Sequence, residues 1–255
     1  MKFGKKGIVM AFTLAEVLIT LGIIGVVAAM TIPTLVANSQ KQEYVSKLRK
    51  TYTMLNQAFS KYAADQGCVG DLLCTGLFSD TTANKLTDWD NFFNNYLKVS
   101  KNCGTGTGCF PTETNFNQPG TITPDTDTAF YKVILADGQS LGIQTFGGGS
   151  LNCNYLTTRP GNPLDRSCAS FVLDLNGTKG PNKSGVDYFP WVSFAINSTH
   201  FIVPMYGSQA FSAYCGSTCI WSDTTGANYY CGKAANSSGQ GCASRIVEEG
   251  WVMNY

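Results

Sequence analysis

One carboxylate, Glu16, lies within an apolar run, FTLAEVLITLGIIGVVAAMTIPTLV, which occupies residues 12–36. Glu16 is the only ionisable side chain among these 25 residues. A charged side chain near the centre of a bilayer costs about 2.5–3.5 kcal/mol even on the most lenient scale, so such residues are usually functional and paired. We therefore expect Glu16 to have a function and a cationic partner.

Ten cysteines form the second group of residues with chemical potential, and all of them lie beyond the apolar run, in surroundings rich in Gly, Asn, Ser and Thr. An even number of cysteines on one side of a membrane segment predicts disulfides in an oxidising compartment. Zinc is the alternative, but the sequence contains no C-x-x-C and only one histidine, His200. Disulfides are therefore the favoured interpretation.

The spacing of the cysteines predicts some of their pairing. Two short loops that each enclose five residues and one longer loop suggest three pairs: Cys68 with Cys74, Cys103 with Cys109, and Cys153 with Cys168. The remaining four allow three pairings, among which the sequence does not choose: Cys215, Cys219, Cys231 and Cys242.

The polar stretch DLNGTKGPNKSGVD, residues 174–187, could bind calcium. Its oxygen-bearing side chains surround flexible glycines, which suits a hard cation, and the candidate ligands are Asp174, Asn176, Asn182 and Asp187. The spacing does not match an EF-hand loop, and Asx turns account for the same residues without an ion. We favour ordinary turns and keep calcium as the alternative.

Composition argues against two classes of protein. The 255-residue chain has a net charge of +1, and its few basic residues concentrate before position 50, so no basic face suitable for nucleic acid is predicted. His200 has no Cys or Ser partner at a recognisable spacing, and oxidised cysteines cannot act as nucleophiles. We therefore expect that this protein is not an enzyme.

The elements that position these residues begin with one long helix. Lys2, Lys5 and Lys6 predict that residues 1–11 stay in the cytoplasm, and residues 12–36 are long enough to span about 30 Å of hydrocarbon. An apolar stripe then continues through residues 37–66 at spacings of three and four: Val45, Leu48, Tyr52, Leu55, Phe59 and Tyr62. The helix should end near Gly67.

The motif AFTLAEV, followed by an apolar helix with Gly25 and Pro33, resembles the prepilin leader and first helix of type IV pilins and type II secretion pseudopilins. The resemblance implies that a membrane-embedded prepilin peptidase cuts between Ala11 and Phe12 and methylates the new amine of Phe12. The family usually has Gly before the cut, where this chain has Ala11. A cut at Ala11 places Glu16 fifth in the mature chain, the position usual in the family.

The resemblance also implies how the subunit assembles. In the family, the glutamate of an incoming subunit pairs with the terminal amine of a subunit already in the filament, and the helix loosens near the Gly and Pro that correspond to Gly25 and Pro33. Major pseudopilins also bind calcium in a loop late in the chain. The implied partners are prepilin peptidase, other pilin or pseudopilin subunits and an assembly platform in the bacterial cytoplasmic membrane.

Residues 67–255 are predicted to form an exported β-rich domain. Short apolar runs separated by Gly, Asn, Asp and Pro predict antiparallel strands, at 129–135, 140–146, 169–175, 191–196 and from 201 onward. The turn ADGQ between the first two of these runs predicts a hairpin. The fold class is therefore α+β and pilin-like, with the sheet packed on the amphipathic half of the long helix and with disulfide-rich loops.

These features together predict a structural subunit, minor or specialised, of a type IV pilus or type II secretion pseudopilus. It would cross the membrane once, with its C-terminal domain exported, before it enters the filament. The alternative is a secreted binding protein or adhesin whose signal peptide is cut after Ala29, following the small residues Val27 and Ala29. A mature terminus at Phe12 or at Met30 distinguishes the two hypotheses.

Overall fold

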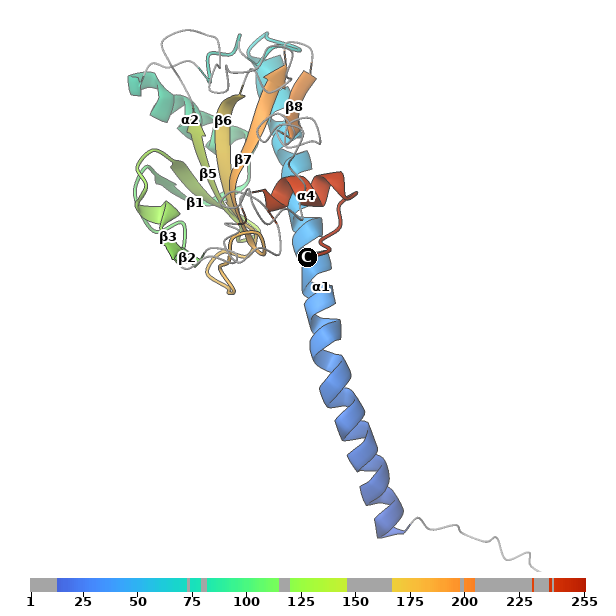
Figure 1. The fold of residues 1–255 in the computed structure, drawn as a ribbon. Coiled ribbons are helices and arrows are strands. Elements are labelled where there is room, and N and C mark those ends of the chain that lie inside the picture. Colours follow the sequence, from blue (N-terminus) through green and yellow to red (C-terminus); the bar gives the residue numbers. More distant parts are fainter. Residues whose placement is uncertain are drawn as a thin grey trace, which may run out of the picture. The chain divides into compact units, whose positions relative to one another are not determined.

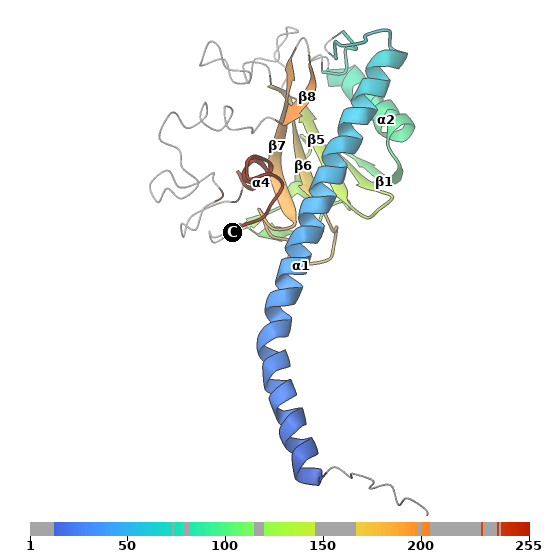
Figure 2. The same cartoon turned by 90° about the vertical axis from the view of Figure 1, so that its right-hand side faces the viewer.

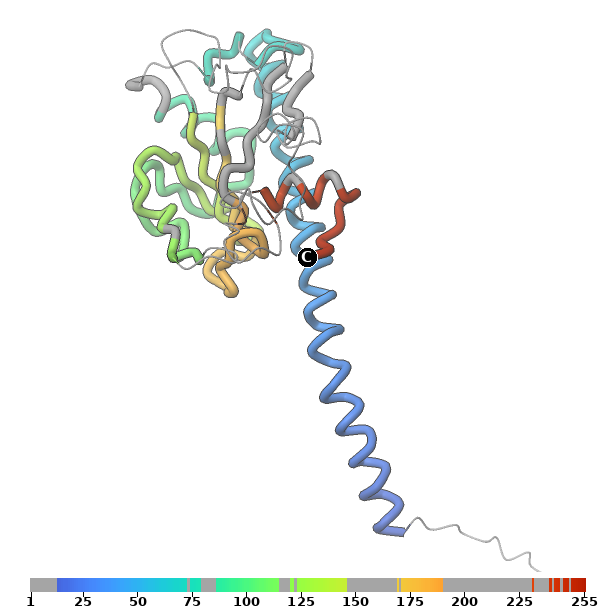
Figure 3. The backbone as a smooth tube through the Cα atoms, in the orientation of Figure 1, coloured from blue at the N-terminus to red at the C-terminus, as the bar shows by residue number. Residues whose placement is uncertain are grey.

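The computed structural model describes residues 13–72, 74–78, 82–114, 120–145, 167–197, 200–204, 231, 239 and 241–255 (Figure 1). Figure 3 draws the backbone as a tube in the same orientation. The helices are α1 (Leu14–Asp65), α2 (Thr82–Tyr96), α4 (Cys242–Glu248) and the short 3-10 helix η1 (Pro124–Thr126). The strands are β1 (Val99–Gly104), β2 (Glu113–Thr114), β3 (Thr121–Ile122), β4 (Tyr131–Leu135), β5 (Ser140–Thr145), β6 (Ser167–Asp174), β7 (Tyr188–Asn197) and β8 (His200–Pro204).

The chain divides into two compact units, Met1–Gln42 and Glu43–Tyr255, and α1 contributes residues to both. The predicted boundary within the helix lay at residue 36, before the start of the second unit. Helix α1 is continuous for 52 residues and ends at Asp65, close to the predicted end. The expected α+β architecture, with a long N-terminal helix, an antiparallel sheet and disulfides, is confirmed.

The second half of α1 buries the apolar face that the sequence predicted. The buried residues lie at helical spacing on one side of the helix: Tyr44, Val45, Leu48, Thr51, Leu55, Ala58, Phe59, Tyr62 and Ala63. This face lies over the sheet (Figures 1 and 2), where Thr51 Oγ1 donates a hydrogen bond to Gln139 Oε1 over 2.6 Å. The Lys47 carbonyl, 3.0 Å from the same hydroxyl, is a second possible acceptor for its single proton, so the buried hydroxyl is satisfied.

The main sheet has six strands in the order β1-β4-β5-β6-β7-β8, and every neighbouring pair is antiparallel (Figure 1). The predicted hairpin joins β4 to β5, because Leu135 and Gln139 close the turn with an N···O distance of 2.8 Å. Gly138 takes a φ of 86° there, a conformation that glycine adopts without strain. Strands β4 to β8 match the predicted strand positions.

Helix α2 and strand β1 lie in a region for which the sequence predicted neither a helix nor a strand. Trp89, Phe93 and Leu97 recur every four residues and are buried, with Phe92 between them. This is a helical stripe that the abundance of Asn, Asp and Thr around it obscured. The aromatic rings of α2 pack on α1, with Phe59 stacked on Phe92 at a centroid distance of 4.5 Å.

Polar loops in the second unit are held by a partly buried carboxylate and a buried ammonium group. The carboxylate of Asp125 accepts hydrogen bonds from three successive backbone N–H groups, those of Gly108, Cys109 and Phe110, at 2.7 to 2.9 Å. Burial alone would raise the pKa of Asp125, but these bonds outweigh it and hold the pKa below its ordinary value. Nearby, the buried Lys132 ammonium donates to the carbonyls of Asp125 and Asp127.

Phe59 is the residue whose truncation should cost the second unit most, because four aromatic rings surround its fully buried side chain. We expect Phe59→Ala to lower the free energy of unfolding by about 3–5 kcal/mol. Denaturant unfolding of the full-length chain in detergent, followed by tryptophan fluorescence, measures this. Ser60→Ala, at the exposed neighbouring position, should change it by less than about 0.5 kcal/mol. Equal effects of the two changes would contradict this account of the core.

Candidate functional site

The first half of α1 presents apolar side chains to its surroundings all the way round. Their exposed fractions range from 44% for Val17 to 79% for Leu14, and the set is Leu14, Val17, Leu18, Ile19, Leu21, Ile23, Ile24, Val26, Val27, Met30, Ile32, Leu35 and Val36. A contiguous apolar surface of this extent indicates contact with a membrane or with other protein chains. The most apolar 18-residue window has a mean hydropathy of 2.2, so α1 is a candidate single membrane span.

The threonine hydroxyls within this apolar half are satisfied inside the helix. Thr20 donates to the Val17 carbonyl, Thr31 to that of Val27 and Thr34 to that of Thr31, at 2.8 to 2.9 Å. Hydroxyls bonded in this way need no water, which removes the main cost of placing threonine in hydrocarbon. The surface is therefore compatible with lipid despite these polar groups.

Glu16 and Thr13 cap the N-terminus of α1 through three mutual hydrogen bonds. Glu16 Oε2 accepts from the Thr13 backbone N–H and from the Thr13 hydroxyl, both at 2.8 Å, and the Glu16 N–H donates to Thr13 Oγ1 at 3.2 Å. This is a capping box, with Thr13 as N-cap and Glu16 at the third helical position. The T-x-x-E spacing is visible in the sequence and could have predicted this cap.

The glycines and the proline of the apolar half lie within the continuous helix. Helix α1 passes through Pro33 without interruption in the single chain. The loosening near Gly25 and Pro33 that the resemblance implies for a filament stays a prediction. A Cβ placed on Gly22 or Gly25 would meet no atom within 4 Å. Nothing in the described part of the chain therefore explains why these positions are small. Ala11 and Phe12, the predicted cleavage site, lie outside the described residues.

Three disulfides are described, and two of them match the predicted local pairs, Cys68–Cys74 and Cys103–Cys109. The third, Cys231–Cys242, selects one of the three pairings left open for the last four cysteines. Its half-cystines are fully buried, and Cys242 is the first residue of α4, which packs next to β7 (Figure 2). Cys153, Cys215 and Cys219 lie outside the described residues, so the pairing of Cys153 with Cys168 stays a prediction.

The loop that follows β6 contains the side-chain to backbone hydrogen bonds of ordinary Asx turns, the interpretation favoured from the sequence. Asp174 Oδ1 accepts the N–H groups of Asn176 and Gly177 at 3.0 and 2.9 Å. Asp187 accepts those of Asn182 and Lys183 at 2.9 and 2.7 Å. The Asn176 amide donates to the Gly180 carbonyl at 3.2 Å. Both carboxylates thus hold the backbone of the loop itself, as in Asx turns.

Calcium remains an alternative for this loop. Within the described ranges, no group of three or more His, Cys, Asp and Glu side chains has an arrangement that could hold a metal ion. The four predicted ligands are near one another in the chain, yet the bonds above direct the two carboxylates at backbone N–H groups. Calcium at Asp174, Asn176, Asn182 and Asp187 therefore stays a prediction.

The structure adds a third acid, Glu113 of β2, to this loop. Glu113, Asp174 and Asp187 are all fully buried, with exposed fractions of 0%. Burial and, after it, the charges of Asp174 and Asp187 raise the pKa of Glu113 to about 9. Burial also raises the pKa of Asp174 to about 7. No local pattern around Glu113 signals this, because its partners lie about sixty residues later in the chain.

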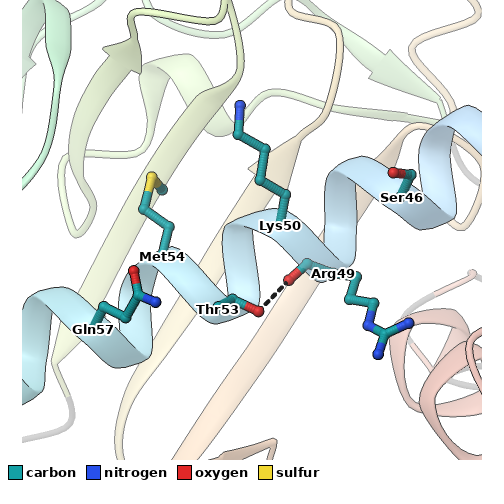
Figure 4. Close-up of a pocket in the computed structure, with 6 residues that line it drawn as sticks. All are labelled: Ser46, Arg49, Lys50, Thr53, Met54 and Gln57. Carbon is teal, nitrogen blue, oxygen red and sulfur yellow. Dashed lines mark hydrogen bonds between the residues drawn. The ribbon is translucent and has the colours of Figure 1, made fainter.

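A hollow on the surface of α1 is lined by Ser46, Arg49, Lys50, Thr53, Met54 and Gln57 (Figure 4). The Lys50 ammonium is held by Asp137 at 2.7 Å, and the Arg49 guanidinium lies 5.7 Å from the ring centroid of Trp251. The Thr53 hydroxyl donates to the Arg49 carbonyl at 3.0 Å. The six residues that line the hollow include no nucleophile with an adjacent base, so we assign it no catalytic role.

No family model, curated protein or solved structure matches this chain. Its function must therefore be inferred from its own physical features. The strongest of these is the unburied apolar half of α1 with a carboxylate in its first turn.

Disulfide mapping of the unreduced protein tests the cysteine chemistry. We expect a cross-linked peptide pair joining Cys231 to Cys242, because the structure bonds them. If the last four cysteines pair among themselves, this bond leaves Cys215 for Cys219, and at least four disulfides should form in total. Thiol counting in denatured, unreduced protein is the second measurement. Mostly free thiols, or a cross-link from Cys231 to Cys215 or Cys219, would contradict the assignment.

Proposed function

We propose that this protein is a structural subunit, minor or specialised, of a type IV pilus or type II secretion pseudopilus. Prepilin peptidase cuts it between Ala11 and Phe12 and methylates Phe12, and the first half of α1 then carries it into a filament. The single observation behind this proposal is an apolar helix surface that is exposed over residues 14–36 and carries one carboxylate, Glu16.

A simple membrane anchor does not account for the residues of this surface. Lipid alone would cover the apolar side chains, but the capping box with Thr13 uses only one of the two oxygens of an acid that costs free energy there. Gly22 and Gly25 each cost about 1 kcal/mol relative to Ala in a helix interior, and nothing in the described chain packs against them. Small residues of this kind allow close approach of a second helix, so other subunits provide the missing contacts.

Glu16 is suited to pair with an amine from another copy of the chain. Both of its bonds to Thr13 go to Oε2, which leaves Oε1 as an acceptor for a cation. The cut at Phe12 would create a positive amine in the same apolar surroundings. Each charge is costly alone in such a site, and pairing offsets the cost for both. A bond between two copies would also set the axial register of the filament.

The second unit fits export across the cytoplasmic membrane. Its disulfides require an oxidising compartment, whereas Lys2, Lys5 and Lys6 favour a cytoplasmic leader. A single span separates the two environments. In this proposal the protein sits in the cytoplasmic membrane with its N-terminus inside and its C-terminal domain outside, and then enters the filament through the assembly platform.

The alternative, a secreted binding protein released by a cut after Ala29, leaves an unfavourable terminus. Met30, Ile32, Leu35 and Val36 are exposed on α1 and would remain on the released protein. A water-soluble chain gains nothing from such a surface and risks aggregation through it. The filament proposal gives the same residues a partner.

Processing at Ala11 is the first test of this function. Protein extracted from membranes of cells with prepilin peptidase should begin at Phe12 and carry one N-methyl group, because only this cut places Glu16 fifth. Intact-mass and N-terminal peptide mass spectrometry measure it. A peptidase-null strain, in which residues 1–11 should be retained, is the control. A terminus at Met30 would support the secreted alternative instead.

Glu16→Ala tests assembly directly. Removing one partner of a buried charge pair leaves the other unpaired, typically at a cost of about 3–5 kcal/mol, so incorporation into filaments should fall severely. Cleavage, export and disulfide formation should persist. Glu43→Ala removes an exposed carboxylate of the same helix and should assemble normally. Shearing filaments from cells that hold no wild-type copy, followed by immunoblotting, gives the measurement. Normal incorporation of Glu16→Ala would reject this role.

A further inference from the structure

The carboxylate of Asp125 lies in a concavity made by backbone N–H groups. Its Oδ2 accepts from Gly108 at 2.7 Å, and its Oδ1 accepts from Cys109 and from Phe110, each at 2.9 Å. Successive N–H groups that point at one anion form a nest, an arrangement that favours negative charge. The carboxylate comes from η1, which lies 15 to 17 residues later in the chain, so the nest joins two separate segments.

The segment that leads into the nest has little order of its own. Its sequence from Cys103 to Cys109 is CGTGTGC, in which three of the five enclosed residues are glycine. Gly108 donates the shortest of the three bonds and has a φ of 98°, a conformation that glycine adopts without strain. Glycine loses more conformational freedom on folding than any other residue, so this loop needs a restraint to keep its N–H groups aligned.

The Cys103–Cys109 disulfide supplies such a restraint. Cys103 belongs to β1, the first strand in the order of the main sheet. Cys109 is buried in a cluster with Phe110 and Tyr188, and its carbonyl accepts a hydrogen bond from the Ser140 hydroxyl of β5. The bond therefore ties the edge of the sheet to a fixed point in the core. It limits the conformations open to the loop between them.

The other groups near the nest hold its two ends rather than the loop. Lys132 Nζ donates to the carbonyls of Asp125 and Asp127 at 2.6 and 2.8 Å, which fixes η1. The ring of Phe110 packs against Tyr188 at a centroid distance of 6.4 Å, which fixes the last donor. The N–H groups of Gly108 and Cys109 remain, and their positions depend on the loop that the disulfide closes.

Lys101 is the one side chain that the structure shows bonded to the backbone of this loop from outside it. Its Nζ donates to the Gly108 carbonyl at 2.6 Å, but Lys101 is exposed. Water competes for a bond of this kind, so its net contribution is small. We therefore assign the alignment of the Gly108 N–H to the disulfide.

We propose that the Cys103–Cys109 disulfide is a redox switch that assembles the nest around Asp125. In the reduced chain residues 104–108 lose their restraint, and the Gly108 and Cys109 N–H groups leave the carboxylate to water. Oxidation closes the loop and returns both donors. The switch keeps this part of the fold incomplete until the second unit reaches an oxidising compartment. It uses no residue of α1, so it is independent of the filament proposal.

The chemistry of the switch is thiol–disulfide exchange. The two cysteine thiols give up two electrons and two protons in total to an external disulfide, whose S–S bond breaks as the bond between Cys103 and Cys109 forms. The other products are the two thiols of the oxidant. Because the oxidised chain binds the carboxylate in the nest, the carboxylate in turn favours the oxidised chain by the same factor. Coupling of this kind is typically about 5–150-fold, which is measurable.

Competition with dithiothreitol tests the coupling in the full-length protein in detergent micelles. At set ratios of reduced and oxidised dithiothreitol, differential alkylation and peptide mass spectrometry give the reduced fraction of each cysteine pair. Asp125→Asn removes the charge that the nest binds, so the exchange equilibrium of Cys103–Cys109 should shift at least about fivefold toward the thiols. Asp127→Asn, the same change on a carboxylate outside the nest, should shift it less than about twofold.

The Cys68–Cys74 disulfide is an internal control, because it also encloses five residues and makes no contact with Asp125 in the described chain. Its exchange equilibrium should be the same in the wild type and in both variants. No shift of Cys103–Cys109 in Asp125→Asn, an equal shift in Asp127→Asn, or an equal shift of Cys68–Cys74 would each overturn the proposal.

Hydrogen exchange provides a second readout, which needs no reductant. In the double variant Cys103→Ser/Cys109→Ser, protection of the Gly108 amide should fall at least about tenfold, while protection of amides in β5 and β6 should change less than about threefold. The matched variant Cys68→Ser/Cys74→Ser should leave Gly108 protected. Unchanged Gly108 protection in the first variant, or an equal loss in the second, would contradict the switch. A loss that extends to β5 and β6 would also contradict it, because the disulfide would then hold the whole unit.

Discussion

The constraint on which the rest of the structure depends is that one continuous helix must satisfy two different environments. Over residues 14–36 the apolar side chains of α1 surround the helix and are covered by nothing in the described chain. Over residues 44–63 the apolar side chains keep to one face, and the aromatic core forms on it around Phe59. Because the backbone satisfies its own hydrogen bonds along its length, the same helix can serve in hydrocarbon and in a protein core.

The second unit compensates for the limited apolar content of its loops with crosslinks and charged side chains. Its loops are rich in Gly, Asn, Ser and Thr, which gain little free energy from burial. Asp125 gathers three backbone N–H groups beside the Cys103–Cys109 disulfide, and Lys132 binds two carbonyls from the adjoining turn. Charge-assisted bonds to backbone groups are stronger than neutral ones, so a few charges can order long polar segments.

Glu16 and Glu113 are acids in apolar and in fully buried surroundings respectively, and the structure treats them differently. Glu16 is bound to Thr13 at the helix terminus and keeps one oxygen for a partner outside the chain. Glu113 is enclosed with Asp174 and Asp187, and neither of its carboxyl oxygens has a hydrogen-bond partner in the described chain. An exposed carboxylate can be stabilised by a cation that arrives from elsewhere. Enclosure without a donor raises the pKa of Glu113 instead.

The long helix, its apolar and amphipathic halves, the strands from β4 to β8 and two disulfides could be predicted from the sequence. All of these depend on neighbours in the chain: side-chain periodicity, a hairpin turn, or cysteines a few residues apart. Helix α2 could also have been predicted, since Trp89, Phe93 and Leu97 are spaced by four. The many Asn, Asp and Thr residues around them made this pattern hard to recognise. The tertiary structure alone decided the Cys231–Cys242 pair and the meeting of Glu113 with Asp174 and Asp187. No pattern in the sequence of one of these segments indicates its contact with the other. Only the packing of the strands and loops between them brings them together.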